Sequence, residues 1–241
     1  AVVTWRNLAQ TIEHEARIGR SHEPRKYRVQ YDETDFDFMR RMLQDAGIAF
    51  HFASSEGGTK LVLDDQPEQG ELAHPLLAFE DTPQVTGASF VTKVSVRRRV
   101  KPGTMTIGDL DYRKPSTAQP RLSTRRGLDV ETRLEQFDYE PAAFLFQGAG
   151  GGNTPTADDR GASRTNESAG MDRTQTRLLA RRRGDRVVGV ESNVLTLAPG
   201  VLFSVANHPH RDVAPDQSLL VTKSELAGVH DGDWRVKVET A

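Results

Sequence analysis

The chain has 241 residues whose charges nearly cancel, because 32 Lys and Arg residues stand against 34 Asp and Glu residues for a formal net charge of −2. It contains no cysteine, which excludes disulfide scaffolds, cysteine nucleophiles, thiolate zinc sites and iron–sulfur clusters. The near-zero net charge argues against a nucleic-acid-binding protein that relies on bulk electrostatics. No apolar run approaches the roughly 18 residues of a membrane helix, and the start lacks a signal-peptide pattern.

The chain opens on Val2-Val3-Thr4-Trp5 rather than on Met, inside an apparent element, so we expect a piece of a longer protein. A first helix is predicted, with Thr4 as its cap and Gly19 at its end. Its apolar face would consist of Trp5, Leu8, Ala9, Ile12 and Ala16. Alternation of apolar and polar residues then predicts a strand over residues 27–31.

The clearest pattern in the sequence predicts a helix that begins after Thr34. Thr34 and Asp37 approximate a capping box, and Gly47 fits the left-handed cap at the other end. The apolar stripe of this helix consists of Phe36, Met39, Met42, Leu43 and Ala46. A hairpin with strands over residues 48–52 and 60–63 follows, so residues 27–65 are predicted to form a strand, a helix and a hairpin.

The rest of the chain is predicted to be rich in strands. A strand over residues 89–100 precedes a Pro102-Gly103 turn, after which residues 105–110 are expected to pair back, and residues 114–126 are predicted to be a loop. Residues 148–170 are poor in apolar side chains and predict a long mobile loop. A helix over residues 172–183, ended by Gly184, leads into further strands at residues 187–190, 194–197, 202–205, 219–222 and 234–238. Because no β-α-β alternation occurs, the predicted fold class is α+β with mainly antiparallel sheets.

Motifs that could carry chemistry are weak. The run Gly148–Asn153 resembles a phosphate-binding loop, but Asn153 replaces its last glycine and no P-loop lysine follows, so a flexible loop is favoured. His208 and His210, with Asp212 nearby, could hold a metal, although a polar turn explains them better. The acidic pairs Asp64-Asp65 and Asp158-Asp159 fit solvated turns, and Ser163 lacks the glycine of a nucleophile elbow. No catalytic, cofactor-binding or metal-binding residue is therefore predicted.

Two arginine triplets are candidates for contact with nucleic acid. Arg97–Arg99 lies on a predicted strand, where Arg98 faces away from its neighbours, and Arg181–Arg183 closes a predicted helix, where positive charge complements the dipole. A structural role for these arginines is therefore favoured over contact with nucleic acid.

Residues 27–52 resemble the signature of the VgrG family, the trimeric spike hubs of the bacterial type VI secretion system. The matching residues are Gln30-Tyr31-x-Glu33-Thr34-Asp35, then Phe38-x-x-Arg41 in the helix, then Gly47-Ile48 with Phe50 and Phe52 alternating. Supporting matches occur at Leu61-Val62-Leu63-Asp64-Asp65, Glu135-x-Phe137-x-Tyr139, Leu197-Ala198-Pro199-Gly200 and His208-Pro209. Met42 and Glu140-Pro141-Ala142 depart from the family pattern, and the stretch from Gly148 to Gly170 is longer than usual.

The resemblance implies a structural rather than enzymatic protein with a phage-tail-hub-like β-barrel and a smaller inserted α+β segment. It implies an N-terminal helix and the first part of the second hub barrel in residues 1–85, the insertion in residues 86–177, and a returning helix with the final barrel strands in residues 178–241. Implied partners are two further copies in a homotrimer, a hexameric Hcp-like tube protein, baseplate proteins, and spike-tip or effector proteins. Assembly in the bacterial cytoplasm would precede secretion through the machine.

Within this framework, we expect the stripe from Phe36 to Leu43 to lie against the barrel. Asp32, Glu33 and Asp35 are interpreted as cap and turn residues rather than interface charges. Two alternatives remain: the hub of a phage tail or an extracellular contractile injection system, and a hydrolase. The hydrolase would need a centre assembled from Asp64, Asp65, His208 and His210.

Overall fold

The computed structural model describes residues 13–22, 28–82, 88–110, 115–116, 119, 121–141, 143–144 and 166–241. These residues divide into two units, which are described separately. The barrel unit contains residues 13–19, Ile48–Arg99 and Arg183–Ala241, and the helical unit contains residues 20–22, 28–47 and Val100–Arg182. The division at residues 85 and 177 expected from the sequence stays a prediction.

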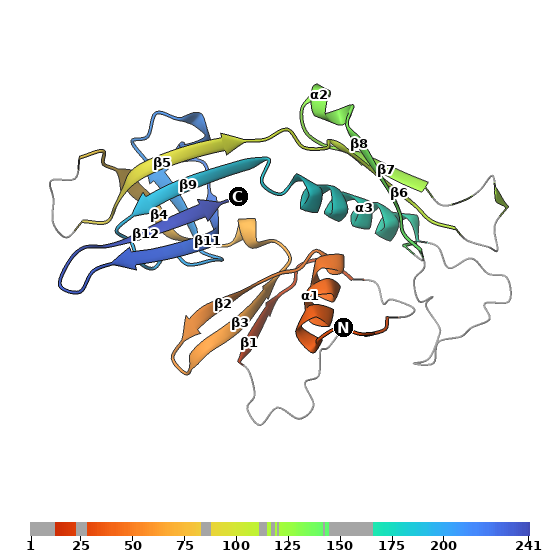
Figure 1. Cartoon of the computed structure of the whole chain (residues 1–241), viewed down its shortest axis with the longest axis horizontal. Coiled ribbons are helices and arrows are strands. Elements are labelled where there is room, and N and C mark those ends of the chain that lie inside the picture. Colours follow the sequence, from red (N-terminus) through yellow and green to blue (C-terminus); the bar gives the residue numbers. More distant parts are fainter. Residues whose placement is uncertain are drawn as a thin grey trace. The chain divides into compact units, whose positions relative to one another are not determined.

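The barrel unit is built around a closed barrel with the strand order β10-β11-β12-β9-β5-β4 (Figure 1). Its strands are β4 (Leu72–Phe79), β5 (Phe90–Arg98), β9 (Arg186–Ser192), β10 (Leu202–Ala206), β11 (Leu219–Gly228) and β12 (Trp234–Thr240). The pairs β5–β9, β9–β12, β12–β11 and β11–β10 are antiparallel, whereas β4 pairs in parallel with both β5 and β10. The predicted α+β class with mainly antiparallel sheets is confirmed, and β4 is the strand that closes the barrel.

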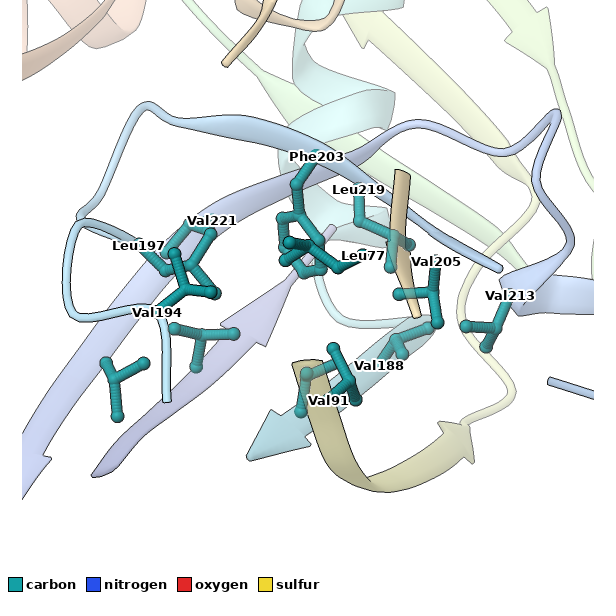
Figure 2. Packing of buried hydrophobic residues seen from close by; sticks show 13 residues of the cluster. Leu77, Val91, Val188, Val194, Leu197, Phe203, Val205, Val213, Leu219 and Val221 are labelled. Carbon is teal, nitrogen blue, oxygen red and sulfur yellow. The ribbon is translucent and has the colours of Figure 1, made fainter. Parts of the chain in front are cut away.

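The barrel interior is a single apolar cluster (Figure 2). Phe203, Val205, Leu219 and Val91 are fully buried, and alternate residues of each strand contribute to the cluster. Closure gives every strand a neighbour on both sides, although β5 meets β4 through two residue pairs and β11 meets β10 through two. A 3-10 turn, η3 (Arg211–Val213), adds Val213 to the same core.

A smaller sheet in the same unit has the order β1-β3-β2. The predicted hairpin is confirmed as β2 (Ala49–Ser55) and β3 (Gly58–Asp64), which pair antiparallel. The strand β1 (His14–Arg17) pairs with β3 in parallel, and the 3-10 turn η1 (Pro67–Gln69) leads from β3 to β4. Val62 is completely buried at the centre of this sheet.

The helical unit begins with α1 (Asp35–Ala46), whose ends match the sequence prediction. The Thr34 side chain accepts a hydrogen bond from the backbone N–H of Asp37, and Gly47 adopts the left-handed conformation with φ 70°. Gly47 N–H donates to the carbonyl of Gln44 at 3.2 Å, which satisfies one of the otherwise unpaired carbonyls at the helix end.

The other elements of this unit form a sheet with a helix on one face. The strands β6 (Thr104–Gly108), β7 (Arg121–Arg125) and β8 (Glu135–Tyr139) have the order β7-β6-β8, and α2 (Asp129–Thr132) precedes β8. The helix α3 (Glu167–Arg182) lies along the sheet (Figure 1). Its Leu178 joins a buried cluster with Met105, Ile107, Phe144 and Ala143.

Two strand predictions and one pairing prediction are wrong because tertiary contacts override local pattern. Residues 194–197 form a turn closed by a hydrogen bond from Leu197 N–H to the carbonyl of Val194, and the side chains of Val194 and Leu197 pack into the barrel core from that turn. Residues 28–31 form no strand, because the carbonyl of Val29 accepts from Arg41 Nη2 at 3.1 Å instead of from a neighbouring strand. Residues 105–110 contribute β6, which pairs with β7 and β8 rather than back onto the strand of residues 89–100.

The remaining corrections concern element type. Ala16, assigned to the first predicted helix, lies in β1, because parallel pairing with β3 satisfies its backbone; the residues of that helix up to Ile12 lie outside the described ranges. Residues 121–125 of the predicted loop form β7. The later helix begins at Glu167 rather than at 172, so residues 167–170 of the predicted mobile loop are helical, and the rest of that loop up to 165 falls outside the description.

Candidate interaction surfaces and the ion-pair cluster

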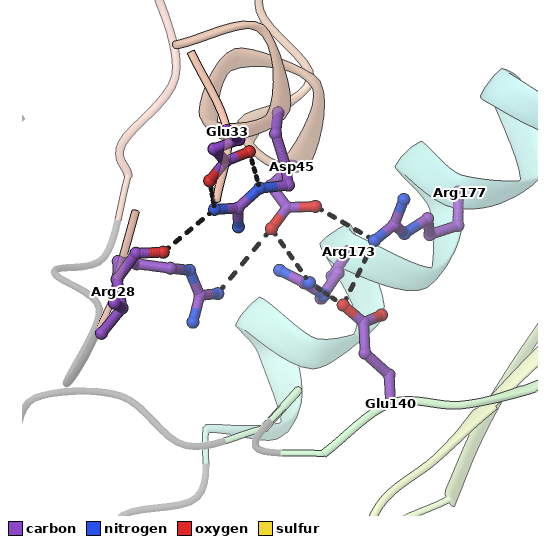
Figure 3. Close-up of polar contacts among 8 residues, drawn as sticks. Arg28, Glu33, Asp45, Glu140, Arg173 and Arg177 are labelled. Atoms are coloured by element: carbon purple, nitrogen blue, oxygen red, sulfur yellow. Dashed lines mark hydrogen bonds and ion pairs between the residues drawn. The ribbon is translucent and has the colours of Figure 1, made fainter. Parts of the chain in front are cut away.

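The carboxylate of Asp45, near the end of α1, is shared by three arginines (Figure 3). Its oxygens lie 3.4 Å from Arg173 Nη2, 3.0 Å from Arg177 Nη2 and 3.8 Å from Arg28 Nη2. Glu140, which follows β8, pairs with Arg173 and lies 3.2 Å from Arg177 Nη2. These side chains, which we call the Asp45 cluster, therefore connect α1, α3 and the end of β8 within the helical unit.

Arg173 is the most buried member of the Asp45 cluster, with 4% of its side chain exposed. Its Nε and Nη1 atoms are buried without a hydrogen-bond partner among the described residues. Loss of hydration lowers the pKa of Arg173, and the neighbouring cations of Arg177 and Arg28 act in the same direction, against the attraction of Asp45. A buried cation of this kind depends on its two carboxylates, because an uncompensated buried charge is costly.

Gly47 allows α1 and α3 to approach closely at the same place. A Cβ atom on Gly47 would lie 2.9 Å from Cγ2 of Thr176, and its φ of 70° also disfavours other residues. The glycine thus serves both as the helix cap and as the contact point of the two helices.

Arg182, at the end of α3, fixes the turn that precedes β6. Its Nη2 lies 3.0 Å from Glu131 Oε2, and its Nη1 donates to the carbonyl of Pro102 at 3.3 Å. Glu131 also accepts from the backbone N–H of Leu128 at 3.1 Å. Hydrogen bonds from Leu128 and Lys101 lower the pKa of Glu131 together with Arg182, against the opposing effect of burial.

The outer face of the β7-β6-β8 sheet carries exposed aromatic side chains. The register aligns Arg121, Gly108 and Tyr139 in one row and Ser123, Thr106 and Phe137 in the next. Phe137 leans across the sheet, because a Cβ on Gly108 would lie 3.0 Å from its Cζ, and the guanidinium of Arg121 lies 5.2 Å from the ring centroid. Phe137 and Tyr139 remain 52% and 55% exposed. We call Arg121, Ser123, Phe137 and Tyr139 the Phe137 face.

A second exposed surface surrounds the start of α1. Tyr31 is 86% exposed, and Asp32 beside it has the left-handed φ of 50° that aspartate tolerates. Asp35 accepts from Gln30 Nε2 at 2.8 Å, and Glu33 pairs with Arg41, so the predicted cap and turn roles agree with these contacts. The same carboxylates of Asp32, Asp35 and Asp37 remain exposed. We call Tyr31, Asp32, Asp35, Phe36 and Asp37 the Tyr31 surface.

The barrel unit presents a groove of about 390 Å³ across the outside of β5, β9, β12 and β11. Gly189 lies on its floor, where a Cβ would meet Ser95 Oγ at 2.6 Å. Charges alternate across the strands, with Glu191 Oε1 lying 3.6 Å from Lys93 Nζ and 3.4 Å from Lys237 Nζ. Four cations and three carboxylates line the groove, and each of these carboxylates is paired with a cation of the same chain.

The hydrolase centre considered from the sequence is not assembled. Asp64 accepts from the backbone N–H of Gln66 at 2.8 Å, and Asp65 accepts from that of Gly19 at 3.0 Å. His210 Nδ1 accepts from the backbone N–H of Asp212. Among the residues with described positions, no three His, Cys, Asp or Glu side chains are grouped so that they could hold a metal.

His208 and Asp212 have structural contacts of their own. The ring of His208 meets Phe79 edge-on with centroids 4.7 Å apart, and desolvation, aided by His210, lowers the pKa of His208. Asp212 binds Arg98 through both oxygens at 2.6 Å, which lowers the pKa of Asp212. This bidentate pair joins β5 to η3.

Four of the six arginines in the two triplets form ion pairs with carboxylates. In the first, Arg97 pairs with Glu239 at 2.6 Å while Arg98, on the opposite face, pairs with Asp212. In the second, Arg181 lies 3.4 Å from Asp138 and Arg182 binds Glu131. These contacts agree with the structural placement favoured from the sequence. The candidates Gly148–Asn153, Asp158-Asp159 and Ser163 lie outside the described residues.

Sequence reasoning missed the Asp45 cluster and the Phe137 face. The spacing of Arg173 and Arg177, four residues apart on one side of a helix, was a usable signal for the first. The alternation of Glu135, Phe137 and Tyr139 was a signal for the second, since it places two aromatic side chains on one face of a strand. Within the described residues, no helix combines the length and the hydropathy that a membrane span requires.

A family model described as the phage tail baseplate hub (GPD) matches residues 5–232. Among curated proteins, the type VI secretion system spike protein VgrG4b of Pseudomonas aeruginosa is 29% identical over 199 residues. That match covers 81% of this chain but 22% of VgrG4b, so the chain spans about a fifth of this relative's length. The resemblance to VgrG proteins noted in residues 27–52 is thereby confirmed.

Solved structures share the fold at low sequence identity. The E. coli c3393 protein, a component of the type VI secretion system, aligns with a TM-score of 0.55 and 14% identity over 97% of this chain and 44% of its own. A tail protein from Neisseria meningitidis aligns with a TM-score of 0.59 and 10% identity over 95% of this chain and 61% of its own. The hub-like β-barrel fold is confirmed by these alignments.

Proposed function

This chain belongs to the phage tail baseplate hub family, and from that premise we propose that it is a hub subunit of a type VI secretion spike. Three copies would form a ring that joins the hexameric tube protein to the spike. Its contribution is mechanical, because a hub transmits force through a rigid, symmetric assembly rather than through a reactive centre.

The closed barrel is the observation that carries this proposal. In a closed barrel every strand has a neighbour on both sides, which limits open-ended pairing with other chains and favours contacts through the loops and the outer face. The curated relative named above is a type VI spike protein, which supports this machine over a phage tail or an extracellular injection system.

Partners and location follow from the same proposal. Besides the tube protein, we propose contacts with baseplate proteins and with spike-tip or effector proteins carried by the whole spike. Assembly would take place in the bacterial cytoplasm, before the machine contracts and expels the spike. We propose no enzymatic activity, cofactor, small-molecule substrate or nucleic-acid partner for this chain.

The test uses the bacterium that encodes the chain, with every other spike gene removed, and measures release of tube protein into the medium. Deletion of the remaining spike gene should abolish release, and the full-length gene should restore it. A full-length gene with Val205→Asp, which places a charge in the barrel core, should fail to restore release. Continued release after deletion would show that the protein is no hub.

A further inference from the structure

A ring of three identical chains needs two different surfaces on each chain that fit each other. Such head-to-tail contacts are heterologous: one surface of the first copy meets another surface of the second, and rotation closes the ring. This inference rests on the proposed trimer and asks which described surfaces could meet.

The Phe137 face is a suitable half of such a contact. Exposed aromatic side chains supply large apolar area at little entropic cost, and Arg121 adds a positive charge directly beside Phe137. Arg121 has no carboxylate partner among the described residues, unlike four of the six arginines in the two triplets. Glu135, on the same face, is held by Thr106 Oγ1 at 2.6 Å.

The Tyr31 surface has the complementary character. Tyr31 and Phe36 are exposed, and three carboxylates surround them, namely Asp32, Asp35 and Asp37. The only cation placed among them by a described contact is Arg40, which lies 3.4 Å from Asp37 and 5.7 Å from the Phe36 ring centroid. The Tyr31 surface thus offers carboxylates beside its aromatic side chains, and the Phe137 face offers the Arg121 guanidinium beside the Phe137 ring.

The two surfaces lie on different sides of the same helical unit. Gly170 and Leu178 of α3 face the inner side of the β7-β6-β8 sheet, so the Phe137 face points away from α3. Arg173, Thr176 and Arg177 face the carboxyl end of α1 instead. The Tyr31 surface is at the opposite end of α1, about 18 Å along the helix axis for twelve residues. Both surfaces are therefore open to other copies at once.

We propose that the Tyr31 surface of one copy binds the Phe137 face of the next, so that this contact repeats around the ring. Aromatic contact supplies the apolar burial, and Arg121 attracts the carboxylates around Asp32. An acidic peptide from another protein would resemble the Tyr31 surface in charge. We favour a second copy because each copy carries both the Tyr31 surface and the Phe137 face.

A charge-swap experiment tests this pairing. Sedimentation equilibrium would give the trimer dissociation constant of the chain, of Arg121→Glu, of Asp32→Lys and of the double variant. Asp233→Lys, on the exposed hairpin between β11 and β12, makes the same charge change far along the sequence and serves as the control. Circular dichroism would verify that each variant is folded.

Each single reversal should weaken every contact of the ring about fivefold. Because the ring has three such contacts, the trimer dissociation constant should rise roughly a hundredfold. The double variant should recover most of that loss, because the reversed charges attract again, and Asp233→Lys should change the constant by less than about twofold.

Two results would overturn the inference: single reversals that leave the trimer unchanged, or a double variant as weak as the two losses combined. A chain that stays monomeric at every concentration would also overturn it, because both surfaces lie in this chain. If the chain is instead monomeric and binds an acidic peptide, and Arg121→Glu abolishes that binding, the acidic-partner alternative is correct. The release assay for the proposed function is independent of all four outcomes.

Discussion

The ring of Phe144 lies against the backbone of Gly170 so closely that a Cβ atom there would fall 2.2 Å from its Cδ1. Phe144 is 1% exposed and belongs to the core between α3 and the β7-β6-β8 sheet. Leu122 also contacts this position, since its Cδ1 would lie 3.2 Å from the same Cβ. The absence of one carbon atom therefore sets how near the helix lies to the sheet.

Replacing Gly170 with Ala should destabilise the protein despite the better helix propensity of alanine. Propensity favours alanine by about 1 kcal/mol, but overpacking a tight core costs about 1–3 kcal/mol, and a ring at this distance calls for the upper part of that range. Urea unfolding should show a net loss of about 1–2 kcal/mol. Gly57→Ala, where a Cβ meets nothing nearer than 3.8 Å, is the matched control and should change stability by less than about 0.5 kcal/mol.

Truncating Phe203 should damage the barrel core. The side chain is completely buried between β10 and its neighbours, so Phe203→Ala should cost about 3–5 kcal/mol by thermal or urea unfolding. Leu226→Ala, on β11 with 56% exposure, should cost less than about 1 kcal/mol. Equal losses for both variants would mean that the cluster in Figure 2 is not the main core of the unit.

Removing the charge of Asp45 should leave Arg173 poorly compensated. Asp45→Asn keeps the shape of the side chain but takes one of two carboxylates from a cation that is 4% exposed, so a loss of about 3 kcal/mol is expected. Glu225→Gln removes a carboxylate from an exposed pair with Lys223 and should leave the urea midpoint almost unchanged, because solvent screens such a pair. A double-mutant cycle with Arg173→Met should show strong coupling, and additivity in that cycle would contradict the ion-pair network.

The contact between β1 and its neighbour β3 should weaken in acid. Hydrogen bonds from Arg17 and Lys60 lower the pKa of Glu15 from 4.5 to about 2. Because the folded pKa is the lower one, the contribution of Glu15 is complete above about pH 5 and is lost as the pH falls toward 2. Glu15→Gln should therefore show a smaller decline in melting temperature across this window than the unaltered chain.

A titration of the Glu15 carboxyl carbon by NMR measures the same effect directly. Arg17→Met should raise the midpoint more than Lys60→Met, since the Arg17 contact is the larger cause. A midpoint near 4.5 in the unaltered chain would show that the two hydrogen bonds are not maintained in solution.

Local signals predicted α1 and the β2–β3 hairpin well because their determinants are neighbours in sequence. Thr34 and Gly47 bound the helix through contacts within three or four residues, and alternation alone identifies β2 and β3. Most barrel strands were predicted for the same reason. The closure of these strands into a barrel is not predicted by any local pattern, because it depends on parallel pairing of β4 with β5 and with β10.

The surfaces and clusters were less accessible to prediction. Asp45 and Arg173 are separated by 128 residues, so their contact exists only once α1 and α3 are packed together. Val194 and Leu197 are apolar enough to suggest a strand, yet their backbone turns while their side chains enter the core. Burial and strand formation are distinct requirements, and hydrophobicity reports only the first.

The main chain leaves the barrel after β5 and returns just before β9, and these two strands are antiparallel neighbours with Arg98 opposite Arg186. A hydrogen bond of 2.8 Å from Arg99 N–H to the carbonyl of Asp185 closes the pair at the point of departure. The segment from Val100 to Arg182 is thus an insertion between two adjacent antiparallel strands. An insertion at this place can change in length or sequence without changing the order of the barrel strands. The same change can be attempted by design, by joining Arg99 to Asp185 with a short turn.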